Sequence, residues 1–579
     1  MKKKHLLLRI GRFLRPYLLT LAGITVLMVA SNLLVLAIPL LSGWALDAVG
    51  TESGSVDVSS VLRNCAGMLG CCALSAAMNY VVSAKLIQVG QAVSYDLRKA
   101  AFQRMSELPV QYFDTHPAGD LISRICYDVD TVNATLSTDL LQICTSLLTV
   151  AGSFVMLLVL SPSLAVVFFV TVPLSVVLTR LQMRRIHPLF RLRSKELGAL
   201  NGFAEERIGR QRAIRAYGVE AEDLRQFEER NDEASRAYYR ADCASASLGP
   251  SVNFINNLSL AAISVFGGLL FISGGLSIGS LSSFVLYSRK FSGPIREAAN
   301  LLSDLQASVA AAERVLDLLD QEPEPADPPE ALEPEHLKGA ISFRHVDFGY
   351  DPDRPVLRDF CADVPAGSMV AVVGTTGAGK TTLVSLLLRF YQRQGGDITV
   401  DGRPLEAYTR DGLRRRLAMV LQDTWLFGGT IAENIAYGTP GATREQIIEA
   451  AKAACIHRFL TSLPDGYDTV LTDEGAGISK GQRQLLAIAR CFLSDADVVI
   501  MDEATSDVDT ETEEQIRAAL ERLRQGRTCF VIAHRLVTVR KADQILVLDG
   551  GAVAESGTHW ELLERGGIYA KLYDAQFAG

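Results

Sequence analysis

Hydrophobic residues in the first half of the chain gather into six long stretches, each near or above twenty residues. A helix rises about 1.5 Å per residue and needs this length to cross roughly 30 Å of hydrocarbon, so the pattern predicts membrane-spanning helices. The expected spans are residues 17–42, 60–84, 139–160, 163–183, 250–273 and 277–299. The first stretch is too long for a secretory signal and lacks a clear cleavage site at its end. We therefore expect an α-helical six-span transmembrane domain in a lipid bilayer.

The charges between the spans predict their orientation. Residues 43–60 contain no lysine or arginine, and the turns 160–163 and 273–279 contain no charged residue. Because lysine and arginine accumulate in cytoplasmic loops, these three loops are expected outside and both termini in the cytoplasm. The intervening segments 85–138 and 184–249 are charged and helix-periodic. They predict long cytoplasmic helix extensions of the spans.

Shifts in composition along the chain predict its domain boundaries. Residues 1–16 mix basic residues with leucine and suit an amphipathic elbow helix on the cytoplasmic face. They belong to an expected transmembrane domain over residues 1–320, and the Pro- and Glu-rich residues 321–337 are typical of a linker. Residues 338–579 form the expected soluble domain. Its short apolar runs, separated mostly by helical patterns, predict a mainly parallel sheet with helices packed on it. These runs are 369–374, 417–422, 498–503, 530–534 and 544–549.

Overall composition agrees with a membrane part joined to a soluble part. The 579 residues are 49% hydrophobic and 21% charged, with a net charge of −8, which is too apolar for an ordinary soluble protein. The net acidity gives no support for nucleic acid as a partner, since binders of polyphosphate backbones usually show a basic patch. Ten cysteines occur without a CxxC pair or an accompanying histidine cluster. We expect them to be free thiols and small apolar fillers, not a metal site or a disulfide framework.

A glycine-rich motif follows the first apolar run of the soluble domain. The stretch GTTGAGKTT matches the phosphate loop pattern G-x-x-x-x-G-K-[ST] and lies between a predicted strand and a helical stretch. Its glycines let backbone N–H groups surround phosphates, Lys380 neutralises them and Thr381 can bind Mg²⁺. The expected nucleotide-binding residues are Gly374, Thr375, Thr376, Gly377, Ala378, Gly379, Lys380, Thr381 and Thr382.

Two further motifs carry candidate chemistry. The apolar run VVIMDE ends in Asp502, a candidate Mg²⁺ ligand, and Glu503, a candidate base for an attacking water. In ISKGQRQLLAIAR, Ser479 and Gln482 have the spacing of a capping box at a helix N-terminus. An exposed helix N-terminus suits a phosphate, yet the phosphate loop about a hundred residues upstream already has its own helix.

Taken in order, these motifs resemble the nucleotide-binding domain of ATP-binding cassette (ABC) transporters. The matching features are Tyr350, GTTGAGKTT, Gln422, ISKGQRQLLAIAR, VVIMDEATSDVD and IAHR. Residues 108–133 and 286–320 resemble the exporter-type transmembrane domain, so the resemblance covers essentially the whole chain. It implies a multi-pass protein of the cell membrane with an α/β P-loop ATP-binding cassette domain. It also implies ATP and Mg²⁺ as cofactors and ATP hydrolysis coupled to transport.

The resemblance assigns roles to four residues outside the phosphate loop. Tyr350 would stack on adenine, one aromatic face against another. Gln422 would bind Mg²⁺ and sense the attacking water, and His534 would contact the γ-phosphate. Asp509 would lie at the dimer seam beside the opposite ATP.

The same resemblance implies a dimer. In ABC proteins the signature helix faces ATP bound to the partner, so Ser479, Lys480, Gly481 and Gln482 would act on the other subunit's nucleotide. Lys480 departs from the family's usual L-S-G-G-Q, because a side chain stands where glycine allows close backbone approach. An altered signature beside an intact Glu503 resembles one chain of a heterodimeric exporter. We expect a second, different half-transporter as partner, while a homodimer remains open.

A few polar residues inside the spans predict a substrate cavity. Asn253, Asn256 and Asn257 fall on one face of span five, where interhelical hydrogen bonds are the favoured interpretation and a cavity lining is the alternative. Arg289 and Lys290 lie in the inner half of span six, where they either face a water-filled cavity or snorkel to the surface. The expected function is export of an amphipathic or drug-like compound. An exporter-shaped importer of metal–siderophore complexes and a nucleotide-gated channel or regulator remain alternatives.

Overall fold

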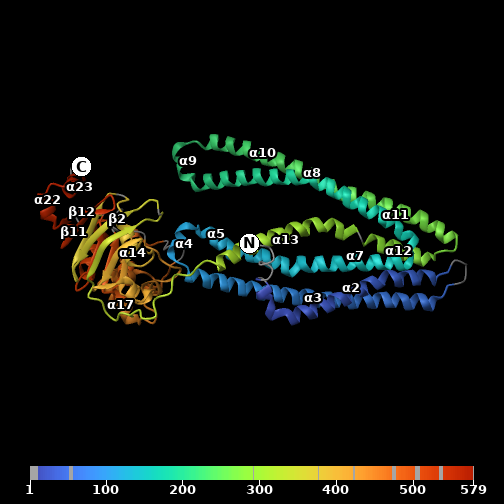
Figure 1. Ribbon diagram of the computed structural model, residues 1–579, viewed down its shortest axis with the longest axis horizontal. Helices are drawn as coiled ribbons and strands as arrows, with labels where there is room; N and C mark the ends of the chain where they lie inside the picture. The colour runs from blue at the N-terminus through green and yellow to red at the C-terminus, as the bar shows by residue number, and fades with distance from the viewer. Residues whose placement is uncertain are drawn as a thin grey trace. The chain divides into compact units, whose positions relative to one another are not determined.

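The computed structural model describes most of the chain (Figure 1). The described residues are 9, 11–50, 56–290, 292–351, 353–375, 377–421, 424–471, 477–502, 509–533 and 539–577. The chain divides into two compact units, Met1–Ser106 with Pro117–Gln321 and Glu107–His116 with Glu322–Gly579. The segment Glu107–His116, which the sequence prediction left within the membrane domain, therefore groups with the second unit. Residues 1–8 and 10 of the predicted elbow helix lie outside the described residues.

The first unit is built almost entirely of helices. Five of its helical stretches, among the described residues, are long and apolar enough to cross a membrane. The long helices are α2 (Leu18–Asp47), α3 (Val58–Glu107), α7 (Leu140–Leu160), α8 (Pro162–Gly209), α10 (Glu220–Ala246), α11 (Leu248–Ile272), α12 (Ile278–Arg289) and α13 (Ser292–Leu319). Shorter segments are η1 (Arg15–Tyr17), α5 (Ala118–Ser123), α6 (Val129–Ala134), α9 (Gln211–Tyr217) and the π-helical turns η2 (Arg124–Asp128) and η3 (Thr135–Asp139).

The sixth predicted span contains two helices, α12 and α13, in place of one continuous helix. Helix α12 ends at Arg289, and Gly293 and Pro294 follow within five residues. Proline has no N–H to donate and clashes with the preceding helical turn, so it fits best near a helix start. Pro294 is the third residue of α13, where its missing N–H would have no intrahelical acceptor.

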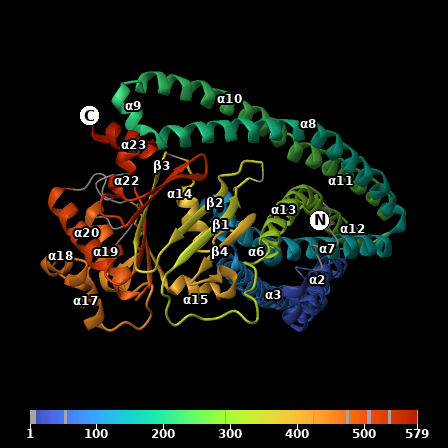
Figure 2. The same cartoon turned by 60° about the vertical axis from the view of Figure 1, so that its left-hand side comes forward.

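Helices α8 and α10 continue far beyond membrane length. With 48 residues, α8 is about 72 Å long, more than twice the roughly 30 Å of a bilayer's hydrocarbon core. Figures 1 and 2 both show α10 running beside the distal part of α8. The Arg193 guanidinium on α8 stacks 3.7 Å from the ring centre of Tyr238 and donates to Asp242 at 2.9 Å. The predicted helix extension over residues 184–249 is thus confirmed as a paired helical arm. The other predicted extension, 85–138, is not continuous, because α3 ends at Glu107 and residues Glu107–His116 group with the second unit.

Helices α2 and α12 approach each other at two glycines. A Cβ on Gly43 would lie 2.6 Å from the Gly279 carbonyl oxygen, and a Cβ on Gly279 would lie 2.0 Å from that of Gly43. Such close backbone approach requires residues without side chains. Beside this contact, the Ser283 hydroxyl donates to the Pro39 carbonyl at 2.7 Å.

The second unit contains two main sheets. A six-stranded sheet has the order β12-β11-β3-β10-β9-β6, in which the edge strand β12 alone is antiparallel to its neighbour. Its strands are β12 (Ala552–Gly557), β11 (Gln544–Asp549), β3 (Met369–Gly374), β10 (Thr528–Ile532), β9 (Val498–Asp502) and β6 (Leu417–Val420). All five predicted apolar runs form strands of this sheet, which confirms a mainly parallel arrangement.

A smaller antiparallel sheet has the order β2-β1-β4-β5. Its strands are β1 (Ile341–Phe348), β2 (Leu357–Val364), β4 (Gly395–Val400) and β5 (Arg403–Pro404), and β7 (Gly429–Thr430) pairs separately with β8 (Val470–Leu471). The helices of the second unit are α4 (Val110–Thr115), α14 (Lys380–Leu387), α15 (Arg410–Arg415), α16 (Ile431–Ile435), α17 (Arg444–Ala453), α18 (His457–Ser462), α19 (Lys480–Leu493), α20 (Thr510–Leu523), α22 (His559–Glu564) and α23 (Ile568–Phe577), with the single turns η4 (Leu405–Ala407) and η5 (Gly466–Asp468).

The six-stranded sheet separates two hydrophobic cores. Successive strand residues point to opposite faces, so Ala371 enters the core shared with α16–α20 while Val372 enters the core shared with α14 and the smaller sheet. Both faces are therefore covered. This burial explains why the strands appear in the sequence as continuous apolar runs with no polar alternation.

The predicted linker is attached to the second unit by ion pairs. Glu324 pairs with Arg414 at 2.6 Å and with Arg410 at 3.4 Å, and Asp327 pairs with Arg410 at 3.0 Å and with Arg389 at 3.3 Å. The side chains of Arg410 and Arg389 are almost buried. The start of the linker therefore belongs structurally to the soluble domain.

Candidate functional site

The carboxyl ends of four neighbouring parallel strands lie at one edge of the large sheet. Strand β10 pairs with β3 and with β9, and β9 pairs with β6, so all four strands end side by side. The phosphate loop follows β3, and Asp502 is the last residue of β9. In open parallel sheets this edge is where ligands bind.

Four predicted site residues lie outside the described residues. They are Thr376 in the phosphate loop, Gln422 after β6, Glu503 after β9 and His534 after β10. In each case the described chain ends within two residues of the predicted one. Their predicted roles remain predictions.

Two glycines give the phosphate loop its backbone shape. Gly377 has φ +85° and Gly379 has φ +99°, in the left-handed region that other residues rarely adopt. At Gly379 a Cβ would also come within 2.7 Å of the Leu357 side chain. The glycines therefore set the turn that leads into helix α14, beside the buried Ala378.

Lys380 points back across this loop from the first residue of α14. Its Nζ donates to the carbonyl oxygens of Gly374 at 2.9 Å and Thr375 at 3.0 Å, and only 6% of the residue is exposed. Burial lowers the pKa of Lys380, and the nearby Asp502 carboxylate opposes this shift. The ammonium thus lies inside the loop and is held by its carbonyl oxygens.

Thr381 and Asp502 fit a magnesium ion. Thr381 is exposed at the start of α14, the helix that follows β3. Asp502 is the last residue of β9, which is separated from β3 by one strand, β10. Hydroxyl and carboxylate oxygens are the ligands that Mg²⁺ takes, usually together with waters and phosphate. The donor set agrees with the predicted cofactor.

Tyr350 presents a half-exposed ring beside the phosphate loop. Its hydroxyl lies 3.2 Å from that of Thr382, and the residue is 48% exposed. The rings of Phe348 and Tyr391 contact it edge to face, with centroids 5.2 and 5.0 Å away. A ring held in this way can stack on a nucleotide base.

Tyr391 extends this aromatic cluster to helix α4. Its hydroxyl donates to the Asp114 carboxylate at 2.5 Å, and burial together with this carboxylate raises the pKa of Tyr391. Asp114 belongs to the segment that connects two parts of the membrane unit. The sequence analysis missed this contact, because no short motif or periodicity links two residues that are 277 positions apart.

The capping box at the signature helix is confirmed. The Ser479 hydroxyl accepts from the Gln482 N–H at 3.2 Å, and the Gln482 side chain accepts from the Ser479 N–H at 3.0 Å. Gly481 is buried, whereas Lys480 is half-buried in the first turn of α19. A positive charge at a helix N-terminus interacts unfavourably with the helix dipole, so the charge of Lys480 does not stabilise α19.

Asp509 caps another helix. Its Oδ1 accepts from the Thr512 N–H at 2.9 Å at the start of α20, and this backbone hydrogen bond lowers the pKa of Asp509. The side chain is exposed.

A cavity of about 300 Å³ opens in the membrane unit between α8, α11 and α12. Its lining contains four of the predicted residues, Asn253, Asn256, Asn257 and Arg289. The remaining lining residues are Phe168, Thr171, Val172, Ser175, Ser259, Leu260 and Ser288. Among the described residues, Ser175 Oγ and Asn256 Nδ2 are buried without a hydrogen-bond partner. Sequence reasoning missed Thr171 and Ser175, although their i, i+4 spacing in span four was a usable signal.

Lys290 is not among the residues that line this cavity. Its Nζ donates to the Val35 carbonyl in α2 at 3.0 Å. Proline at position 39 has no N–H, so the carbonyl four residues earlier, Val35, lacks its helical donor. Lys290 supplies that donor, which gives it a structural role in holding α12 to α2.

Comparisons with known proteins agree with this architecture. The family model of the ABC transporter transmembrane region matches residues 21–295, and the ABC transporter model matches residues 357–506. The fatty acid ABC transporter ATP-binding/permease protein of Mycobacterium tuberculosis is 43% identical over 517 residues, 89% of this chain and 82% of that protein. The ATP-dependent lipid A-core flippase of Syntrophus aciditrophicus is 36% identical over 489 residues, 84% and 81% of the two chains. The structure of a bacterial Atm1-family ABC exporter with ATP bound superposes with a TM-score of 0.78 at 28% identity, covering 97% and 98%.

Proposed function

The chain belongs to the ABC transporter family, and we propose that it exports an anionic amphipathic compound as one half of a heterodimer. It is an exporter half-transporter of the cell membrane whose ATP hydrolysis is coupled to transport. The observation that carries the substrate proposal is the polar cavity between α8, α11 and α12.

The cavity combines one cation with unpartnered polar atoms in an apolar bundle. Arg289 can bind a carboxylate or phosphate through two parallel hydrogen bonds, and the amide of Asn256 offers a further donor. A buried donor without a hydrogen-bond partner is unfavourable, so the polar head group of a substrate would supply the acceptor that the Asn256 amide lacks. The surrounding Phe168 and Leu260 suit an apolar tail. The names of two relatives, a fatty acid transporter and a lipid A-core flippase, fit such an amphipath.

The test compares a fatty acid with the fatty alcohol of equal chain length. The two share an apolar tail, but the acid alone carries a charge for Arg289. We expect the acid to stimulate ATPase activity of the reconstituted transporter at lower concentration than the alcohol, and Arg289→Gln to remove most of this preference. Equal stimulation by acid and alcohol in the wild type would contradict the anionic substrate while leaving export itself intact.

Lys290→Met is the matched control. This change removes the neighbouring cation and leaves the cavity lining unchanged. It should lower thermal stability, because the hydrogen bond to the Val35 carbonyl is lost. The preference for the acid should persist. A lost preference in Lys290→Met would show that net charge near the inner surface, and not Arg289, selects the substrate.

The heterodimer is supported by Lys480 together with Glu503. In the nucleotide site, Lys380 and the loop N–H groups would hold the phosphates, while Thr381, Asp502 and Gln422 would hold Mg²⁺, which neutralises developing phosphate charge. Glu503 would position the attacking water and His534 the γ-phosphate. The signature residues Ser479 to Gln482 and the dimer-seam Asp509 would serve the partner's nucleotide, and Lys480 would weaken that second site.

ATPase activity of the chain purified alone distinguishes the two kinds of dimer. We expect little turnover until a second half-transporter is co-expressed, and we expect Lys480→Gly to change nucleotide occlusion more than maximal hydrolysis. In a homodimer Lys480 would face both working sites. Robust turnover of the chain alone, strongly altered by Lys480→Gly, would refute the heterodimer.

A further inference from the structure

Two bulges lie close together where β1 pairs with β2. The register of the pairing shifts between Phe343 and Val346 and again between Val346 and Phe348. One bulge leaves His345 with φ +50°, and the other leaves Asp359 with φ +49°. Positive φ is uncommon outside glycine, and such residues cluster at functional sites.

The bulge in β1 decides where His345 points. Ile341 and Phe343 are buried on one face, and the regular alternation of a strand would bury residue 345 next. The extra residue shifts the alternation, so that Val346 and Phe348 are buried in its place. His345 and Asp359 are consequently exposed, with about three quarters of each side chain accessible, 75% and 76%.

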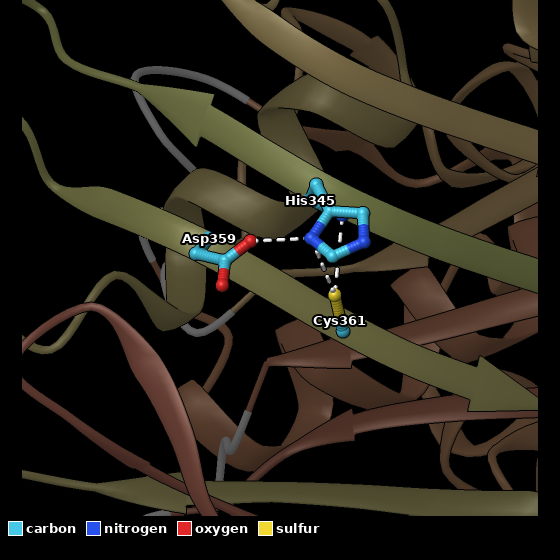
Figure 3. A group of neighbouring side chains, drawn as sticks. All are labelled: His345, Asp359 and Cys361. Atoms are coloured by element: carbon cyan, nitrogen blue, oxygen red, sulfur yellow. Dashed lines mark hydrogen bonds and ion pairs between the residues drawn. The ribbon is translucent and has the colours of Figure 1, made fainter.

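Figure 3 shows that these two side chains converge with Cys361 on β2. His345 Nδ1 lies 2.5 Å from Asp359 Oδ1 and 3.7 Å from Cys361 Sγ. The backbone N–H of His345 donates to the same sulfur at 3.2 Å, which fixes its position. The three potential ligand atoms all lie within 4.8 Å of one another.

We propose that His345, Asp359 and Cys361 form a surface binding site for a divalent transition-metal cation of the zinc class. Imidazole nitrogen, thiolate sulfur and carboxylate oxygen are the ligands that zinc takes, whereas Mg²⁺ and Ca²⁺ take oxygen. Three protein ligands leave a fourth tetrahedral position for water. The site is separate from the Mg²⁺ site of the phosphate loop and does not depend on the proposed transport function.

The distances agree with this assignment. With zinc bonds of about 2.0–2.3 Å, tetrahedral geometry separates nitrogen from sulfur by about 3.6 Å and nitrogen from oxygen by about 3.4 Å. The Nδ1 to Sγ distance already matches. The Nδ1 to Oδ1 pair must open by roughly 1 Å, which two exposed side chains can do by rotation. Coordination through Nδ1 needs the neutral imidazole with its proton on Nε2, a carboxylate and a thiolate, so binding of the cation releases the proton of the Cys361 thiol.

A bound cation would also join two strands of the smaller sheet. His345 belongs to β1 and the other two ligands belong to β2, so coordination would cross-link the strands at their bulges. Strand β1 leads directly to Tyr350. The site would therefore stabilise the strand that precedes the proposed adenine contact.

Cobalt(II) titration of the tag-free, full-length protein in excess Mg²⁺ tests the proposal. We expect one equivalent to bind with the absorption of a thiolate-to-cobalt charge transfer, and zinc to displace it. Cys361→Ser should abolish this absorption. His345→Asn and Asp359→Asn keep a residue type that tolerates positive φ, and each should weaken binding at least about tenfold, since even outer-shell changes cost about 10- to 100-fold.

Two matched controls separate this cluster from ordinary surface groups. The exposed His336 lies 3.5 Å from Asp497, whose side chain is mostly buried, and this second histidine–aspartate pair has no cysteine ligand assigned to it, so His336→Asn should leave cobalt binding unchanged. Cys455→Ser removes another thiol of the same unit and should also have no effect. A charge-transfer absorption that is absent, survives Cys361→Ser, or disappears in either control would overturn the proposal. Thermal unfolding of each variant confirms that lost binding does not reflect lost folding.

Discussion

Replacing Lys380 by methionine should weaken ATP binding without unfolding the protein. The lysine is almost buried, and its Nζ already donates to the carbonyl oxygens of Gly374 and Thr375. On ATP binding the ammonium would exchange these carbonyl oxygens for charged phosphate oxygens, so the expected net gain is near that of one hydrogen bond to a charged group. That gain is about 1.5–3 kcal/mol, which corresponds to a roughly 10- to 150-fold rise in the dissociation constant.

Methionine keeps the length of the side chain but cannot donate. The two carbonyl oxygens then lose a donor, which should cost about 1–3 kcal/mol of stability if no water replaces it. Thermal unfolding of the variant therefore has to accompany the binding measurement. A lower unfolding temperature alone does not count as lost affinity.

Displacement of a fluorescent ATP analogue from the purified full-length protein measures the affinity. Lys541→Met is the control, because Lys541 is an exposed lysine of the same unit that pairs with Glu521 at 2.7 Å. Its ATP affinity should equal that of the wild type. A folded Lys380→Met variant that binds ATP within about twofold of the wild type would refute the assigned phosphate contact.

Three further changes have defined outcomes. Glu503→Gln should retain ATP binding but lower ATPase turnover by a factor of at least about 10²–10⁴, measured by phosphate release; retained turnover would remove Glu503 as the base. Tyr391→Phe removes the hydrogen bond to Asp114 and should reduce substrate stimulation of ATPase roughly fivefold, about 1 kcal/mol, with unchanged ATP affinity. Burial lowers the pKa of His559, so on acidification the histidine of the unfolded chain is protonated first, and the stability of the folded protein should fall below a pH of about 6.5. His559→Gln should reduce this loss in thermal unfolding scans, and an unchanged pH profile would contradict the role of His559.

The features that the sequence determined are those encoded in short windows. Apolar stretches of membrane length predicted the spans, because the helix rise fixes how many residues cross a bilayer. Continuous apolar runs predicted the strands of the parallel sheet, because both of its faces are buried. The phosphate loop and the Ser479 capping box are local chemistry, and the structure forms the box between residues three apart. Roles carried by Gln422, Glu503 and His534 came from resemblance and remain predictions.

Tertiary structure alone decided the contacts between distant residues. Lys290 reaches Val35 only because α12 packs on α2 beside Pro39, whose missing N–H leaves that carbonyl without a donor. Tyr391 meets Asp114 across 277 positions, and His345 meets Cys361 only after a bulge turns the histidine out of the core. Periodicity in a sequence reports which face of an element is apolar. It does not report strand register or helix docking, because these depend on packing against partners elsewhere in the chain.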